Sequence, residues 1–311
     1  MKGLEISEKY YKSFGEPILR RDFPELLQKI AAGLLGAGSE CLGYDDETSR
    51  DHDFEPGFCF FLPDEDAVSR REAFLLERAY EKLPKEFMGL SREKLIPPGG
   101  RRHGVIRISD FLTDRIGRPE PELSRTEWLS LPEQSFLEIT NGKVFFDGSG
   151  ELTKIRNRFR FLPPDIAEKK LAGNLLYAAQ CGQYNYERCL QHGESGAAQL
   201  ALGSFTEAAM HCCFLLSERY MPYYKWRFRA FSELSGFRQF HSSFELLLTS
   251  GNTETEAEEK KQIIAEVLRK IVTDCGFPGD TDPGKAAYRI NDGIRDEQVR
   301  NLHILSAVQT Q

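Results

Sequence analysis

The hydrophobic positions in the first half of the chain change between helical and strand spacing. Apolar side chains at helical intervals, among them Phe23, Leu26, Leu27 and Ile30, predict two amphipathic helices within residues 1–35. A charged helix is predicted over about 64–83. Apolar, aromatic or alternating runs predict strands at 54–62, at 103–112 and in the two arms of a hairpin over 136–147, whose turn is Asn141-Gly142.

The second half has helical spacing throughout. Pro163-Pro164 marks the change, and Asp165 is a suitable N-cap for a long helix that runs to about Gln191 and ends at Gly193. Further helices are predicted at 195–218, 225–235, 238–249, 256–274 and 285–307. We therefore expect an α+β protein of two domains, with a mixed sheet and helices over 1–162 and an all-α helical bundle over 163–311.

Composition narrows the class of protein. The net charge is −7, whereas a large nucleic-acid footprint normally requires a basic face, so we expect no extended nucleic-acid surface. No apolar run approaches the roughly 18 residues of a membrane span, and the N-terminus has no secretory signal. The seven cysteines show no CxxC pair and no zinc spacing. These features predict a cytoplasmic protein with reduced thiols and no membrane partner.

An acidic stretch precedes the strand expected at 54–62. Five acidic residues lie between 45 and 53, with only Arg50 to balance them. If the strand begins early enough, its alternation places Asp51 and Asp53 on one face with their Cα atoms roughly 7 Å apart. Such carboxylates repel each other, but Mg²⁺ offsets the repulsion and binds carboxylate oxygens together with substrate phosphates. Asp51 and Asp53 are therefore the predicted ligands of two Mg²⁺ ions.

A turn of small residues lies twelve positions before Asp51. Gly38 lets backbone N–H groups approach a phosphate closely, and Ser39 adds a hydroxyl group. Together Gly38 and Ser39 predict a nest for the phosphates of a nucleotide. Asp-His-Asp in an acidic loop also occurs as a solvated turn, but the aromatic strand that follows favours the metal-binding interpretation.

The segment "GAGSECLGYDDETSRDHDF" at 36–54 resembles the Gly-Ser…Asp-x-Asp motif of the polymerase-beta-like nucleotidyltransferase superfamily. With "YYKW" at 223–226, most of the chain resembles an uncharacterised bacterial family of that superfamily, catalogued as a domain of unknown function. The resemblance implies an N-terminal catalytic domain and a C-terminal helical domain like that of the aminoglycoside (kanamycin-type) nucleotidyltransferases. It also implies that ATP or another NTP is the substrate.

Enzymes of this superfamily usually add a third carboxylate from a neighbouring strand, as a metal ligand or as the base that deprotonates the acceptor. The alternatives here are Asp110, Glu138 and Asp147. We include Asp147 among the catalytic residues, because it ends an apolar strand beside the flexible turn at 148–150. Asp also commonly opens an ordinary turn. Without a third acid, nucleotide binding persists while turnover is weak or absent.

Basic and aromatic residues gather at two places in the helical half. Tyr184, Asn185 and Arg188 share one helical face, and Lys225 and Arg227 lie among Tyr220, Tyr223, Tyr224 and Trp226. Arg and Lys suit phosphates and aromatic rings suit a stacked base, so these residues, with Arg50, are predicted to bind the nucleotide. The alternative for the second group is a helix junction whose aromatic residues fill a domain interface.

The leading hypothesis is a Mg²⁺-dependent nucleotidyltransferase that moves an NMP, AMP from ATP, to a hydroxyl group of a small molecule or a protein and releases pyrophosphate. A catalytically weak or inactive nucleotide-binding module is the first alternative. The second is a ribonuclease-like helical domain, which "RCLQH" at 188–192 suggests through its Arg and His. Neither the acceptor nor the oligomeric state follows from the sequence.

Overall fold

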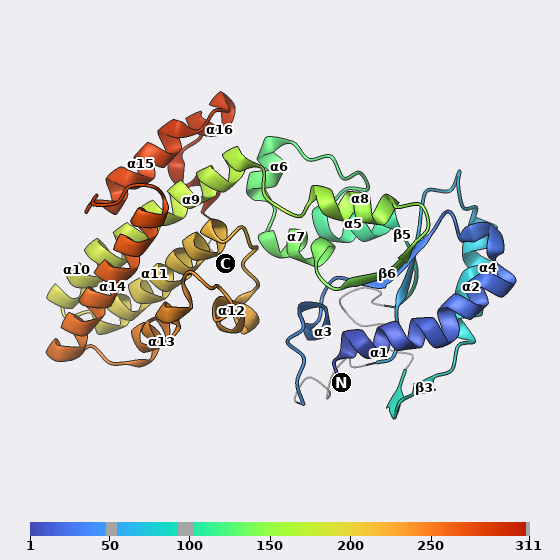
Figure 1. Ribbon diagram of the computed structural model, residues 1–311. Coiled ribbons are helices and arrows are strands. Elements are labelled where there is room, and N and C mark those ends of the chain that lie inside the picture. Colours follow the sequence, from blue (N-terminus) through green and yellow to red (C-terminus); the bar gives the residue numbers. More distant parts are fainter. Residues whose placement is uncertain (48–54, 93–102, 309–311) are drawn as a thin grey trace. The chain divides into compact units, whose positions relative to one another are not determined.

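The computed structural model describes residues 1–47, 55–92 and 103–308 (Figure 1). The chain divides into two compact units, each made of two segments. Unit 1 contains Met1–Glu122 and Gln134–Arg160, and unit 2 contains Leu123–Glu133 and Phe161–Gln311. A short segment before residue 134 therefore belongs with the C-terminal part of the chain.

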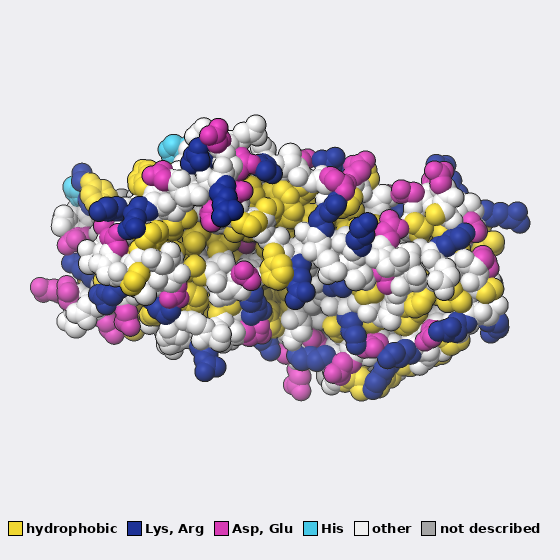
Figure 2. Space-filling model, turned by 45° about the horizontal axis from the view of Figure 1, so that its top comes forward, with side chains coloured by type: hydrophobic (Ala, Val, Ile, Leu, Met, Phe, Trp, Pro, Cys, Tyr) yellow, Lys and Arg dark blue, Asp and Glu magenta, His cyan; other side chains and the backbone are white. Residues whose placement is uncertain are grey.

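Charged side chains of both signs are dispersed over the face of the molecule shown in Figure 2. On the face shown in Figure 2, Lys and Arg side chains lie among Asp and Glu side chains, with hydrophobic side chains exposed between them. The seven cysteines are free thiols. Among the helices in the described ranges, none combines the length and the hydrophobicity needed to cross a membrane.

Unit 1 is built on a mixed sheet of four strands in the order β5-β2-β1-β6. The central strand β1 is antiparallel to both of its neighbours, β2 and β6, and β2 is parallel to β5. Their bounds are Ala31–Leu34 (β1), Cys59–Leu62 (β2), Gly104–Arg107 (β5) and Lys143–Asp147 (β6). A separate two-stranded sheet pairs β3 (Glu86–Phe87) with β4 (Leu90–Ser91).

The strand directions bring four connections to one edge of this sheet. Because β1 runs opposite to the other three strands, the point where β1 ends lies beside the points where β2, β5 and β6 begin. The residues after β1 are Gly36–Ser39, which we call the glycine turn. We call this edge of the sheet the glycine-turn edge.

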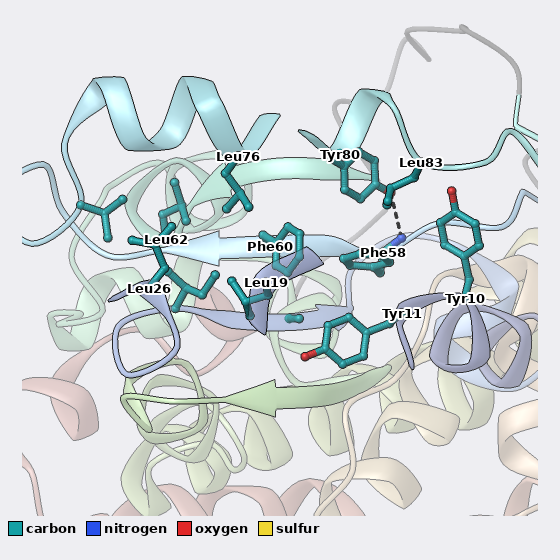
Figure 3. Packing of buried hydrophobic residues seen from close by; sticks show 13 residues of the cluster. Tyr10, Tyr11, Leu19, Leu26, Phe58, Phe60, Leu62, Leu76, Tyr80 and Leu83 are labelled. Carbon is teal, nitrogen blue, oxygen red and sulfur yellow. Dashed lines mark hydrogen bonds between the residues drawn. The ribbon is translucent and has the colours of Figure 1, made fainter. Parts of the chain in front are cut away.

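The core of unit 1 packs between one face of the sheet and an N-terminal helical segment together with α4. That segment consists of α1 (Gly3–Tyr10), the π-helix η1 (Tyr11–Gly15), α2 (Glu16–Asp22) and the 3₁₀ turn η2 (Pro24–Leu26), while α4 spans Arg70–Glu81. Phe58 and Phe60 point to this face because strand side chains alternate, and they pack against Tyr10, Tyr11 and Tyr80 (Figure 3). The backbone N–H of Phe58 also donates to the hydroxyl of Tyr80, over 3.1 Å.

The other face of the sheet packs against α5 (Ile108–Ile116), which Figure 1 shows on the side opposite α1 together with α7 (Glu133–Thr140) and α8 (Glu151–Arg158). Phe61, which alternates with Phe60, meets Phe111 of α5 edge to face at 5.3 Å between ring centroids. Phe136 of α7 stacks on Phe159 at 5.9 Å. The short helix α3 (Ser39–Leu42) follows the glycine turn.

Three sequence predictions in unit 1 are wrong in part. The helical pattern over 1–35 ends at Asp22, and its last residues form β1. The hairpin predicted over 136–147 is a helix followed by a strand, since Phe136 and Ile139 are both fully buried at a helical i,i+3 spacing in α7. The strand predicted at 103–112 stops at Arg107, where α5 begins.

Unit 2 is helical. Its elements are α6 (Arg125–Ser130), α9 (Pro164–Ala179), η4 (Gln180–Asn185), α10 (Tyr186–Gln191), α11 (Ser195–Leu216), α12 (Tyr224–Phe231), η5 (Arg238–Phe240), α13 (His241–Thr249), α14 (Glu254–Asp274), α15 (Pro283–Gly293), α16 (Glu297–Asn301) and η6 (Ile304–Ala307). With the mixed sheet of unit 1, this unit confirms the predicted α+β class.

Two details of unit 2 differ from the prediction. The helix expected over 285–307 is divided into α15, α16 and η6. Asp165 lies inside the first turn of α9 rather than at its N-cap, and its carboxylate accepts hydrogen bonds from the backbone N–H groups of Arg295 and Asp296. Asp165, which was expected to cap α9, therefore stabilises the connection between α15 and α16.

Candidate functional site

The glycine turn has a backbone that only glycine adopts readily. Gly36 has a φ of +102° and Gly38 a φ of +120°, both in the region that L side chains rarely enter. A Cβ atom on Gly36 would lie 2.5 Å from Nη2 of Arg115. Gly38 is the N-cap of α3, and Ser39 is its first residue. Sequence analysis predicted Gly38 and Ser39 as phosphate contacts, and these roles stay predictions. The need for glycine at position 36 appears only in the structure.

The loop before β6 holds the glycine turn in place. The side-chain amide of Asn141 donates to the carbonyl oxygen of Gly36 over 2.8 Å and accepts from its N–H over 2.9 Å. The N–H of Gly142 donates to the carbonyl of Cys41 in α3 over 2.9 Å. Asn141 and Gly142, which sequence analysis interpreted as a hairpin turn, therefore hold the glycine turn and the helix that follows it.

Arg156 of α8 holds the backbone around Asn141 in position. Its guanidinium donates to the carbonyl oxygens of Ile139, Thr140 and Asn141, over 3.1, 2.6 and 2.7 Å. These carbonyls lie at and just after the C-terminus of α7, where a cation also interacts favourably with the helix dipole. The position of Asn141 thus rests on a half-buried arginine that the sequence patterns did not single out.

A cation and an acid lie beside the glycine turn. Arg115 of α5 approaches Gly36, and its Nε lies 3.8 Å from Oε2 of Glu138 in α7. The other carboxylate oxygen of Glu138 accepts from the amide of Gln134 over 2.9 Å. Burial raises the pKa of the nearby Cys41 thiol to about 12, and the charge of Glu138 adds to the effect. This shift favours the protonated thiol over the thiolate at Cys41.

The first residue of the acidic stretch has a structural role. Asp45 is 4% exposed, and its carboxylate accepts from the N–H of Gly3 over 2.8 Å and lies 3.7 Å from Nζ of Lys2. It thus satisfies and charge-balances the N-terminus of α1. Arg50, Asp51 and Asp53 lie outside the described residues, so their predicted roles stay predictions.

The described residues resume at Glu55, which lies at the glycine-turn edge. Glu55 lies two residues after Asp53, and its Oε2 is 4.0 Å from Nδ1 of His103, the residue that precedes β5. Within the described ranges, no group of three His, Cys, Asp or Glu side chains is arranged to hold a metal ion.

The structure separates the three candidates for a third carboxylate. Asp147 pairs with Ala31 at the start of β1, which is the opposite edge of the sheet from the glycine turn. Its carboxylate accepts from the N–H of Gly150 and from the N–H and hydroxyl of Thr153, so that it caps the start of α8. These contacts give Asp147 a structural role at the start of α8, and the catalytic role that the sequence predicts for it stays a prediction. Asp110 follows the C-terminal end of β5 and lies toward the same opposite edge.

Glu138 remains as the candidate near the glycine turn. It lies one helical turn before Asn141 and belongs to a helix, not to the predicted hairpin strand. The sequence named Glu138 among the alternatives, and that role stays a prediction, but the hairpin predicted for this segment gave its side chain the wrong direction.

The predicted nucleotide-binding residues of the helical half all lie in unit 2. Tyr184, Asn185 and Arg188 are exposed, and Arg188 donates to the hydroxyl of Tyr184 over 2.8 Å. Lys225 is exposed and lies 5.1 Å from the ring centre of Trp226. Arg227 is 8% exposed and forms an ion pair with Glu207 at 3.1 Å, which joins α12 to α11. These contacts do not test a role in nucleotide binding, so that role stays a prediction for all five residues.

Unit 2 also contains a buried ionic cluster that sequence analysis missed. Oε1 of Glu133 lies 2.8 Å from Nε2 of His211 and 3.4 Å from Nζ of Lys170, and all three side chains are at most 6% exposed. Burial by itself would raise the pKa of Glu133, but His211 and Lys170 outweigh it and lower the pKa to about 2. Because the three residues are far apart in the sequence, no spacing pattern predicts that they lie together.

Comparisons with known proteins give limited similarity. The family model "Domain of unknown function (DUF4037)" matches residues 128–227, less than half of the chain. The crystal structure of a nucleotidyltransferase-like protein from Exiguobacterium sibiricum 255-15, at 1.90 Å resolution, is similar with 11% identity and a TM-score of 0.39, over 93% of this chain and 81% of that chain. Among curated proteins there is no match. A likeness of this size assigns no activity and no residue role to this chain.

Proposed function

We propose that the protein is a Mg²⁺-dependent nucleotidyltransferase that transfers AMP from ATP to a hydroxyl group and releases pyrophosphate. The observation that carries the proposal is the glycine turn itself. Gly36 and Gly38 have glycine-only conformations, and Asn141 locks the turn at the sheet edge that the chain reaches two residues after Asp53. A locked turn is preorganised for binding, because its backbone pays little further ordering entropy when an anion arrives.

The donor set fits the ions that the proposal requires. Asp51 and Asp53 supply carboxylate oxygens, which Mg²⁺ prefers, and Gly38 and Ser39 are the proposed phosphate contacts. When bound, Mg²⁺ supplies positive charge that offsets the charge of the triphosphate and of the leaving pyrophosphate.

Glu138 is the proposed base, because it is the candidate acid near the glycine turn. In the reaction the acceptor oxygen bonds to the α-phosphorus, and the bond from that phosphorus to the oxygen that bridges it to the β-phosphorus breaks. Pyrophosphate leaves with the electron pair, and the hydroxyl proton passes to the carboxylate of Glu138. The positioned turn and base contribute mainly by holding the reacting groups in place.

The test compares two double substitutions of equal charge and equal spacing. Asp51→Asn/Asp53→Asn removes the proposed metal ligands, while Asp64→Asn/Asp66→Asn changes two exposed aspartates elsewhere in unit 1. Pyrophosphate release from ATP is measured with Mg²⁺ and a panel of small-molecule and protein hydroxyl acceptors, and circular dichroism checks the fold.

We expect release from the wild type and from the Asp64/Asp66 control, and none from the Asp51/Asp53 variant. Equal release from both variants would reject the metal site. ATP binding without release by the wild type, whatever the acceptor, would reject transfer in favour of a nucleotide-binding module.

A further inference from the structure

Arg115 brings a positive charge to the backbone of the glycine turn. Its side chain is 14% exposed, and Nη2 lies 2.5 Å from the position that a Cβ atom of residue 36 would take. The guanidinium also lies over the ring of Phe111, 4.2 Å from its centre. The cation is therefore held against the turn by its own helix, α5, and reaches Gly36 without any side chain in between.

The hydrogen-bonding capacity of Arg115 is largely unused. A guanidinium has five N–H donors. Among the residues that the structure describes, the one hydrogen bond that Arg115 makes is a long one of 3.4 Å, from Nη1 to the carbonyl oxygen of Phe111. Its Nε is buried and has no hydrogen-bond partner. Glu138 at 3.8 Å and Asp114 at 4.0 Å are close enough for attraction, but too far for hydrogen bonds.

Two other arginines of unit 1 show what a purely structural arginine looks like in this fold. Arg107 donates to the carbonyls of Pro63 and Val68, over 2.7 and 3.1 Å. Arg156 donates to three carbonyls at the end of α7. Both are satisfied by backbone oxygens, whereas Arg115 has a comparable degree of burial and is not.

We propose that Arg115 binds the polyphosphate group of the nucleotide beside the glycine turn, an assignment that rests on the proposed function above. Its fork of donors matches phosphate oxygens in pairs. Glu138 balances the charge of Arg115 in the free protein through a loose ion pair. A polyphosphate offers Arg115 a stronger partner, and the carboxylate of Glu138 is then released to accept a proton.

The experiment measures binding of inorganic tripolyphosphate, ATP and adenosine by calorimetry in the absence of Mg²⁺. Arg115→Ala should weaken tripolyphosphate and ATP binding about 10- to 100-fold, which corresponds to the loss of one or two charge-assisted hydrogen bonds. Arg115→Lys should recover part of this loss, since it keeps the charge but not the fork. Adenosine binding should stay unchanged. Arg78→Ala, which removes an exposed arginine paired with Glu81, is the control for net charge.

Glu138→Gln gives the sharpest distinction from a structural role. With its competing acid removed, Arg115 should bind tripolyphosphate more tightly, by about threefold or more, while pyrophosphate release falls. Unchanged tripolyphosphate binding in Arg115→Ala, Arg115→Lys and Glu138→Gln would overturn the assignment of Arg115, while the Asp51/Asp53 test would judge the proposed function separately. If Arg115→Ala does not fold, Arg115→Lys and Glu138→Gln still decide, since they are predicted to change affinity in opposite directions.

Discussion

Replacing Asn141 by alanine removes both hydrogen bonds between its amide and the buried backbone of Gly36. These bonds measure 2.9 and 2.8 Å, and they join residues 105 positions apart. A hydrogen bond contributes about 0.5–1.5 kcal/mol net, and a buried partner left unsatisfied costs about 1–3 kcal/mol. We therefore expect Asn141→Ala to destabilise unit 1 by about 2–4 kcal/mol. Asn141→Asp keeps an acceptor for the N–H of Gly36 but places a second oxygen against its carbonyl, so it should destabilise at least as strongly.

The assay follows the two units separately. Both tryptophans, Trp128 and Trp226, lie in unit 2, so their fluorescence during urea unfolding reports that unit. Hydrogen exchange of peptides that cover β1 and the glycine turn reports unit 1. Asn141→Ala should speed exchange in those peptides and leave the tryptophan transition unchanged. Asn157→Ala, at an exposed position of α8, is the matched control. Unaltered exchange at β1 and the glycine turn in Asn141→Ala would refute the view that this amide locks the turn.

Other predictions concern single side chains. Glu133→Gln should destabilise unit 2 by about 3–5 kcal/mol, because it leaves the buried Lys170 and His211 without their carboxylate partner. A smaller shift of the urea midpoint than in an exposed Glu233→Gln control would contradict this. In the folded protein the pKa of Glu133 is lowered from 4.5 to about 2, which corresponds to a contribution of about 3 kcal/mol to the free energy of unfolding. This contribution is complete above pH 4.5 and is lost as the pH falls from 4.5 to 2. Urea midpoints across that pH range measure the loss. Asp147→Asn should lower the melting temperature, because it weakens the hydrogen bonds that cap the start of α8, but it should keep pyrophosphate release. Loss of release with an intact fold would support the catalytic role that the sequence predicts for Asp147. Gly36→Ala should weaken tripolyphosphate binding and stability together, because the new Cβ meets Arg115 at a positive φ; wild-type affinity would show that the turn tolerates other conformations.

The helices of unit 2 were predictable because long periodic segments carry a strong signal. The spacing over 195–218 and 256–274 matches α11 and α14 to within a few residues. β1 was not predictable in this way, because Ala31, Ala32 and Gly33 have little preference for a strand. It is a strand because β2 and β6 pair with it on both sides and bury all four of its residues.

The short apolar run at 136–147 is ambiguous for a physical reason. Its residues fit an alternating arm as well as one helical turn, and Asn141-Gly142 is compatible with either. Burial of Phe136 and Ile139 on one side decides in favour of α7, and burial of this kind depends on elements elsewhere in the chain.

By itself, the sequence determined the α+β class, the helical character of the second half, and the presence of a glycine turn followed by an Asp-x-Asp segment. These are local properties of spacing and backbone chemistry. Only the tertiary structure decided which distant side chains meet at that turn. Glu138 and Asn141 come to it because they precede β6, which begins at the edge where β1 ends. Arg115 comes to it from α5, which starts after β5 at the opposite edge and brings Arg115 back to Gly36. The same geometry takes Asp147 away from the turn, since the first and last residues of β6 lie at opposite edges of the sheet.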